Sequence, residues 1–230
     1  GQPNLFVYIV TQPLLAAFSP AMAEKILAAT YVILIPCATL SLAIGAQKSA
    51  VLTHLALWPL LYGFMFFFGF YNYCFGLLFA LLGIACWLWM RRKTGLWPVA
   101  TLGALASAGY VIHLFPLGAM MLFIGVGALI DFVTQIRHKR RNPDLSFAAC
   151  VQQKIAFVLV RPAIAMAPAL CLVLIFLAGR SGSETMYLTD KGQVGYGLAE
   201  RFSHITMLSF NLTFGPLDAL ISIAIILIGA

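Results

Sequence analysis

Charged residues are scarce in this sequence of 230 residues. They make up 9% of the chain, whereas hydrophobic residues make up 62% and the mean hydropathy is +0.98. A soluble globular domain has about 25% charged and about 45–50% apolar residues. This shortage of charge excludes a soluble globular enzyme, a disordered tail and a nucleic-acid-binding domain, and it leaves a membrane protein.

Sequence motifs of several catalytic and nucleotide-binding classes are also missing. The chain has no P-loop, no G-x-G-x-x-G, no H-E-x-x-H and no G-x-S-x-G. Its cysteines form no C-x-x-C pair, and each lies in or beside an apolar segment: Cys37, Cys74, Cys86, Cys150 and Cys171. The cysteines therefore predict neither a zinc site nor a disulfide framework, and we assign no metal ligand.

Long apolar runs are what the sequence does contain. They are unbroken over helix-spanning lengths, unlike the alternating strands of a β-barrel. We therefore predict an all-α fold, a polytopic transmembrane helical bundle with about six to seven spans. The expected spans cover 26–46, 51–69, 71–90, 96–112, 114–135 and 147–178, and a last one begins near 214.

Shorter features complete the predicted organisation. Residues 4–18 are broken by Pro13 and predict an interfacial or re-entrant segment, and Ser19 followed by proline is typical of a helix start. Residues 180–213 predict a polar outer loop. The chain begins at Gly1 and ends inside an apolar run that is shorter than the roughly 20 residues of a span. We therefore expect a single transmembrane domain over 1–230 that is an internal piece of a longer protein.

Prolines inside the expected spans predict irregular helices. Pro36 and Pro59 lie within the first two spans, and the long span 147–178 contains Pro162 and Pro168. Proline removes a backbone donor and kinks or breaks a helix. We expect a kink at Pro36 and a tilt or a break at the last two positions.

Basic residues are clustered, and the clusters predict an orientation. The chain has 14 Lys+Arg against 7 Asp+Glu. Nine of the basic residues lie in expected loops or near helix ends: Lys48, Arg91, Arg92, Lys93, Arg137, Lys139, Arg140, Arg141 and Lys154. The positive-inside rule places the loops 91–95 and 137–146 in the cytoplasm. Topology and lipid headgroup contact explain this charge better than nucleic-acid binding does.

Polar residues at the outer ends of the expected spans are candidates for a binding site, because polar groups at membrane depth are costly. Tyr71 and Asn72 form a polar lip, although Asn72 is also a favoured helix cap. His113 lies at the outer corner after the fourth span, as a donor to an anionic ligand, a proton carrier or a structural residue. Asp218 begins the last span, where a carboxylate also complements the helix dipole.

Two further charges lie within expected spans. Arg161 in span 147–178 is a candidate to neutralise a phosphate or a carboxylate such as Asp131. Asp131 can equally pair with the basic cluster at the end of its own span. The candidate substrate-binding residues are thus Tyr71, Asn72, His113, Arg161 and Asp218.

Several short motifs resemble a group of uncharacterised bacterial multi-pass membrane proteins that are similar to the GT-C superfamily of glycosyltransferases. The family's typical forms are P-N-L-L-V-Y, A-E-K-L-L, G-F-x-N-F-x-L-G and Y-x-x-H-L-F-x-x-G. The matching segments here are 3–8, 23–27, 69–76, 87–91, 110–118 and 217–220. Tyr71, Asn72 and His113 fall on these motifs, and Asp218 lies in the last segment.

The resemblance implies a GT-C-like bundle in the bacterial cytoplasmic membrane that moves a sugar from a polyprenyl-phosphate donor on the outer face. The superfamily's acidic residue in the first large outer loop would precede Gly1, so no catalytic residue carries over. A divalent metal would likewise depend on residues outside this chain. A transporter or lipid-flipping protein with proline-broken helices, and a non-catalytic membrane scaffold, are the alternatives.

Overall fold

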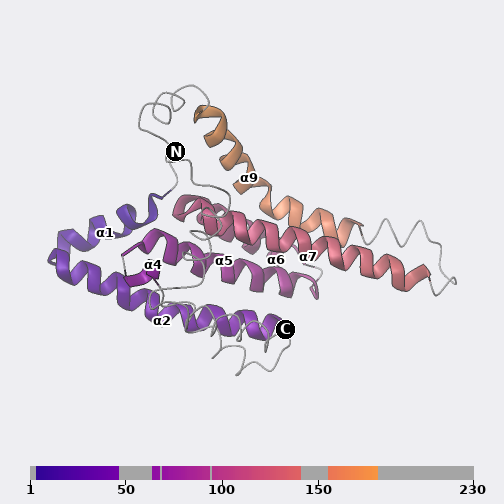
Figure 1. Ribbon diagram of the computed structural model, residues 1–230, viewed down its shortest axis with the longest axis horizontal. Helices are drawn as coiled ribbons and strands as arrows, with labels where there is room; N and C mark the ends of the chain where they lie inside the picture. Colours follow the sequence, from indigo (N-terminus) through magenta and orange to yellow (C-terminus); the bar gives the residue numbers. More distant parts are fainter. Residues whose placement is uncertain (1–3, 47–63, 68, 94, 141–154, 181–230) are drawn as a thin grey trace, which may run out of the picture.

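The computed structural model describes residues 4–46, 64–67, 69–93, 95–140 and 155–180 (Figure 1). Every regular element in these ranges is a helix, so the all-α prediction is confirmed for this part of the chain. The elements are α1 (Phe6–Ala17), α2 (Pro20–Ala46), α4 (Phe64–Phe67), α5 (Tyr71–Met90), α6 (Trp97–Ile112), α7 (Leu114–Arg140), the π-helix η1 (Ile155–Val160) and α9 (Arg161–Arg180). Most of the expected span 51–69, the 180–213 loop after Arg180 and the span from 214 lie outside the described residues.

Four segments are long and apolar enough to cross a membrane: Pro20–Ala46, Tyr71–Met90, Leu114–Thr134 and Val158–Gly179. Two other apolar helices, α1 and α6, are shorter. At about 1.5 Å per residue, α6 is roughly 24 Å long, less than the hydrocarbon thickness of about 30 Å. The described part of the chain is therefore a multi-pass helical bundle with four candidate spans. The helix α6 matches the expected span 96–112 to within one residue but is not one of these four.

The central helix of the bundle is α5. It packs against α2, α6 and α7, while α9 packs chiefly against α6. Half of the residues in the most apolar stretch of α5 are buried, whereas 17% are buried in the corresponding stretch of the span that contains α9. Figure 1 shows α1 and α2 meeting in a V at the left, and α9 leaving the other long helices at an angle.

Two apolar clusters hold these helices together. The first joins α2, α5 and the end of α6, and α1 packs on it: Leu27, Tyr31, Ile35, Ala38, Cys74, Phe75, Leu78 and Ile112. The second joins α5, α6, α7 and α9 and includes Trp87, Leu102, Ala106, Met120, Ile124, Ala165 and Ala169. Small residues in the second cluster allow the close helix approach that is typical of membrane bundles.

Large apolar side chains also cover the outside of the bundle. Ile33 of α2, Leu122 of α7 and Ile175 of α9 are each about two-thirds exposed, at 67%, 69% and 68%. Soluble proteins rarely expose apolar patches of this extent. Lipid chains are the solvent that suits these faces, so the helices associate with a bilayer.

The prolines affect the helices in different ways. Pro13 lies inside α1, so the break that we expected there is wrong. Pro36 lies inside α2, which continues as one helix past the position of the expected kink. The predicted start of α2 is confirmed, because the Ser19 hydroxyl accepts a hydrogen bond from the Met22 N–H at 3.4 Å.

The expected break at Pro162 coincides with a change of helix type. The π-helix η1 ends at Val160 and α9 begins at Arg161. Pro162 has no N–H to donate to the preceding turn, which interrupts the α-helical hydrogen-bond ladder at this point. Pro168 lies inside α9 and does not end it.

Glycines permit the closest contacts of α5 with α7. A Cβ atom on Gly83 would overlap the Met120 sulfur, and a Cβ atom on Gly127 would overlap the edge of the Trp87 ring. On the same helix as Gly127, a Cβ atom on Gly125 would meet no atom within 4 Å.

Substitution of Gly127 should therefore separate packing from helix propensity. We expect Gly127→Ala to destabilise the bundle by about 1–3 kcal/mol, because the rigid Trp87 ring must move. Gly125→Ala should be neutral or slightly stabilising, since alanine favours a helix. Reversible unfolding of both variants in mixed micelles measures the difference, and equal stabilities would show that α5 and α7 do not pack in this way.

Candidate functional site

The candidate residues lie at opposite ends of the bundle. Tyr71 and Asn72 begin α5, and His113 follows the last residue of α6; we call this the Asn72 end. Arg161 begins α9 beside the turn that follows α5; we call this the arginine end. The structure thus gathers three of the candidates, separates Arg161 from them, and leaves Asp218 outside the described residues.

The Asn72 side chain binds the start of α1. Its Oδ1 accepts a hydrogen bond from the Val7 N–H at 2.9 Å, and its Nδ2 donates one to the Asn4 carbonyl at 3.0 Å. Val7 is in the first turn of α1, where backbone N–H groups lack partners within the helix. Asn72 is therefore a helix cap, as one of the two interpretations held, but the helix that it caps is α1 and not its own.

The backbone before α1 is shaped for this contact. Asn4 has a φ of 71°, a left-handed conformation that asparagine tolerates better than most residues. The next N–H, that of Leu5, donates to the Val111 carbonyl near the end of α6 at 3.0 Å. The 4–5 segment thus joins α5 to α6, which accounts for the position of α1 at this end.

His113 joins α6 to α7. Its N–H donates to the Gly109 carbonyl at 2.9 Å, and its Nδ1 accepts a hydrogen bond from the Phe115 N–H at 3.2 Å. The side chain therefore caps the start of α7, and this bond requires an unprotonated Nδ1. Burial lowers the pKa of His113 below its usual value of 6.5, which favours that neutral form.

Aromatic rings and one carboxylate complete this end. The Tyr73 ring lies edge-on to the His113 ring with centroids 5.7 Å apart, and it lies 6.2 Å from the Phe115 ring. The Tyr71 hydroxyl donates a hydrogen bond to Oε1 of Glu24, an exposed residue of α2, at 3.1 Å. Glu24 was not among the candidates; its place in the A-E-K motif was the signal, but only the fold shows its partner.

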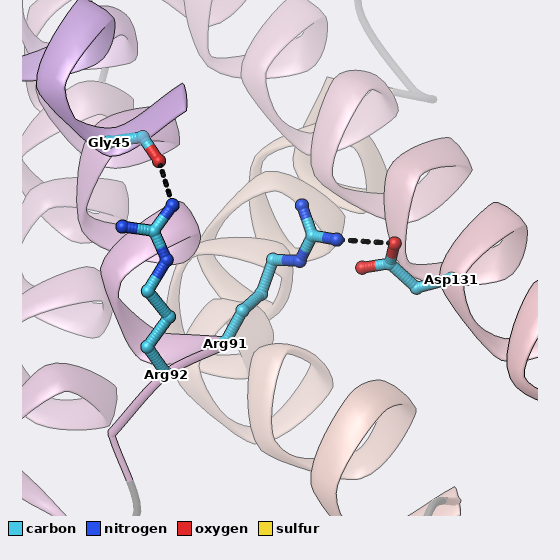
Figure 2. A network of polar contacts seen from close by, with 4 residues as sticks. All are labelled: Gly45, Arg91, Arg92 and Asp131. Atoms are coloured by element: carbon cyan, nitrogen blue, oxygen red, sulfur yellow. Dashed lines mark hydrogen bonds and ion pairs between the residues drawn. The ribbon is translucent and has the colours of Figure 1, made fainter. Parts of the chain in front are cut away.

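The arginine end is built from α2, α5 and α7. The Arg91 guanidinium forms an ion pair with Asp131 at 2.6 Å and lies 5.2 Å from the centre of the Trp87 ring. The Arg92 guanidinium donates to the Gly45 carbonyl, in the last turn of α2, at 2.8 Å (Figure 2). We expected Asp131 to pair with the basic cluster at the end of its own span; its partner here is Arg91, from the cluster that follows α5.

Arg161 binds backbone in the same region. Its guanidinium donates to the carbonyls of Lys93 at 2.8 Å and Gly95 at 2.5 Å. Arg161 lies half-buried at the start of α9, near one end of the candidate span Val158–Gly179, so it falls within a span as we expected. Its expected partner, Asp131, is bound by Arg91 instead.

The positions of these side chains also limit which ligands the described residues can hold. Within the ranges that the structure covers, no group of three or more His, Cys, Asp or Glu side chains is arranged to hold a metal ion. Among the described residues, the Asn72 end offers the Glu24 carboxylate, the Tyr71 hydroxyl and several ring faces. Searches found no family model, no curated protein and no solved structure that matches this chain.

Replacing Asn72 should free α1 from the bundle. We expect Asn72→Ala to raise the hydrogen-exchange rate of the backbone amides in 5–17 about 5- to 30-fold, as loss of a cap costs about 1–2 kcal/mol. Amides of α5 beyond its first turn should be unaffected. Exchange mass spectrometry on the reconstituted protein measures both, and unchanged exchange in α1 would rule out the cap.

Acid should destabilise the His113 corner. The unfolded chain binds the proton at a pKa of about 6.5, and the folded chain binds it only at lower pH because burial lowers the pKa of His113. Stability should therefore be complete above about pH 6.5 and fall as pH drops towards the folded pKa. His113→Asn keeps a capping acceptor and does not titrate, so it should lose less stability below pH 6.5 than the wild-type protein. Thermal unfolding from pH 5 to 8 tests this, and parallel curves would contradict it.

Proposed function

We propose that this chain is the membrane bundle of a GT-C-like glycosyltransferase and that the Asn72 end meets the sugar of a polyprenyl-phosphate-type donor. The observation that carries the proposal is the pair formed by the Glu24 carboxylate and the Tyr71 hydroxyl. It lies at the boundary of two candidate spans, at the same end as the Tyr73 and Phe115 rings. The resemblance to bacterial GT-C-like proteins covers these same segments.

The chemistry of the donor suits this position. A lipid-linked sugar has an apolar tail that stays in the bilayer and a polar head that lies at its surface. Carboxylates and hydroxyls bind sugar hydroxyls, and tyrosine rings are amphipathic at the membrane–water boundary. Glu24 and Phe115 are exposed and are therefore accessible to such a head group.

The proposal assigns the sugar, and not the phosphate, to the Asn72 end. Arg161 lies at the arginine end and does not face this site. In the proposed orientation the Asn72 end is external, and the loops 91–95 and 137–146 are cytoplasmic. No catalytic acid or metal ligand is assigned within this proposal, and Asp218 stays a candidate of the external side.

A non-catalytic membrane scaffold is the second candidate, and one specific observation favours it. The polar side chains of Asn72 and His113 bind backbone groups of this same chain. Both residues therefore have a structural purpose that needs no ligand. The two candidate functions predict different binding: the glycosyltransferase prefers a lipid that carries a sugar at the Asn72 end, and the scaffold does not.

The test is a binding comparison in nanodiscs. The whole chain is offered a polyprenyl-phosphate hexose or the same polyprenyl phosphate without sugar, and native mass spectrometry measures which is retained. We expect the glycosylated form to be preferred. Glu24→Gln and Tyr71→Phe should each reduce the preference about tenfold, the effect of losing a hydrogen bond to a charged group.

Tyr8→Phe is the matched control, because Tyr8 is an exposed tyrosine of α1 at 70% exposure. It should leave the preference unchanged. Equal retention of the two lipids by the wild-type chain would contradict the glycosyltransferase proposal and favour the scaffold.

A further inference from the structure

Positive charge is concentrated at the arginine end. Among the side chains that the structure describes, four cations lie there: Arg91, Arg92, Lys93 and Arg161. Asp131 is the one described carboxylate beside them, so positive charge is in excess. By contrast, Glu24 and Lys25 balance each other at the Asn72 end.

Arg91, Arg92 and Arg161 are held in place by the fold. Arg91 binds Asp131, Arg92 binds the Gly45 carbonyl, and Arg161 binds carbonyls of the turn after α5. Backbone carbonyls accept these hydrogen bonds but carry no net charge. The positive potential of the end therefore remains while its arginine side chains are engaged.

Lys93 differs from the arginines. Its side chain is exposed, and it forms no ion pair with any residue that the structure describes. Its backbone carbonyl is bound by Arg161, which fixes the position from which the side chain extends. The Lys93 backbone is thus held in place, and its exposed ammonium group can contact an anion outside the protein.

Exposed apolar side chains lie within four residues of this lysine in the sequence. Leu96 is 84% exposed and Trp97 is 80% exposed at the start of α6, and Trp89 near the end of α5 is 57% exposed. Tryptophan is enriched at the membrane–water interface, where its ring lies at the level of the headgroups. A soluble polyanion would leave these side chains in water, whereas a bilayer surface covers them.

We propose that Lys93, Leu96, Trp97 and Trp89 form a surface that binds anionic phospholipid headgroups. The Lys93 ammonium contacts the lipid phosphate, Leu96 and the two tryptophans enter the boundary between headgroups and acyl chains, and the three arginines supply the surrounding potential. This surface lies at the end opposite to the proposed sugar site and does not depend on that proposal.

The test uses the whole chain in nanodiscs that contain phosphatidylglycerol and phosphatidylcholine in equal amounts. Native mass spectrometry after release measures the ratio of the two lipids that remain bound. We expect the wild-type protein to retain phosphatidylglycerol preferentially. Lys93→Gln should lower that ratio about fivefold, the effect of one basic residue at an anionic surface.

Two control variants keep the result interpretable. Lys25→Gln removes the same charge from an exposed lysine at the Asn72 end and should leave the ratio unchanged. Lys93→Arg keeps the charge and should keep the ratio. An unchanged ratio in Lys93→Gln, or an equal fall in Lys25→Gln, would overturn the proposal, and a thermal unfolding curve of each variant checks that the bundle is intact.

Discussion

Backbone groups at helix ends are the constraint on which this structure depends. The N–H groups at the start of a helix and the carbonyls at its end have no partners within the helix. In this chain, side chains from neighbouring segments satisfy several of them. Asn72 and His113 bind N–H groups at the starts of α1 and α7, and Arg92 binds a carbonyl at the end of α2.

The helix α5 gains its central position from these contacts. Its first turn supplies Asn72 to α1, and the residues after its last turn supply Arg91 to α7 and Arg92 to α2. Arg161 of α9 then binds the turn that follows α5. Apolar packing along α5 holds the neighbouring helices laterally, and the polar contacts at its two ends set their positions along its axis.

Hydropathy and charge predicted the parts of the fold that depend on one segment at a time. The bounds of α5 match the expected span 71–90, and α6 and α7 begin within one residue of expectation. Contacts between segments could not be predicted in the same way. Three features depend on which helices are neighbours: Asn72 as a cap for α1, the pairing of Tyr71 with Glu24, and the position of Arg161. Hydropathy does not indicate which helices are neighbours.

The separation of polar groups into an Asn72 end and an arginine end, at opposite faces of a bilayer, is the central claim. Single cysteines at Gly95 and Phe115, introduced after replacement of the five native cysteines, test it directly. A Cβ atom on Gly95 would meet nothing within 4 Å, and Phe115 is exposed, so both positions can accept a label. A membrane-impermeant maleimide should label Phe115→Cys only in right-side-out vesicles and Gly95→Cys only in inverted ones. Labelling of both positions from the same side would contradict the account.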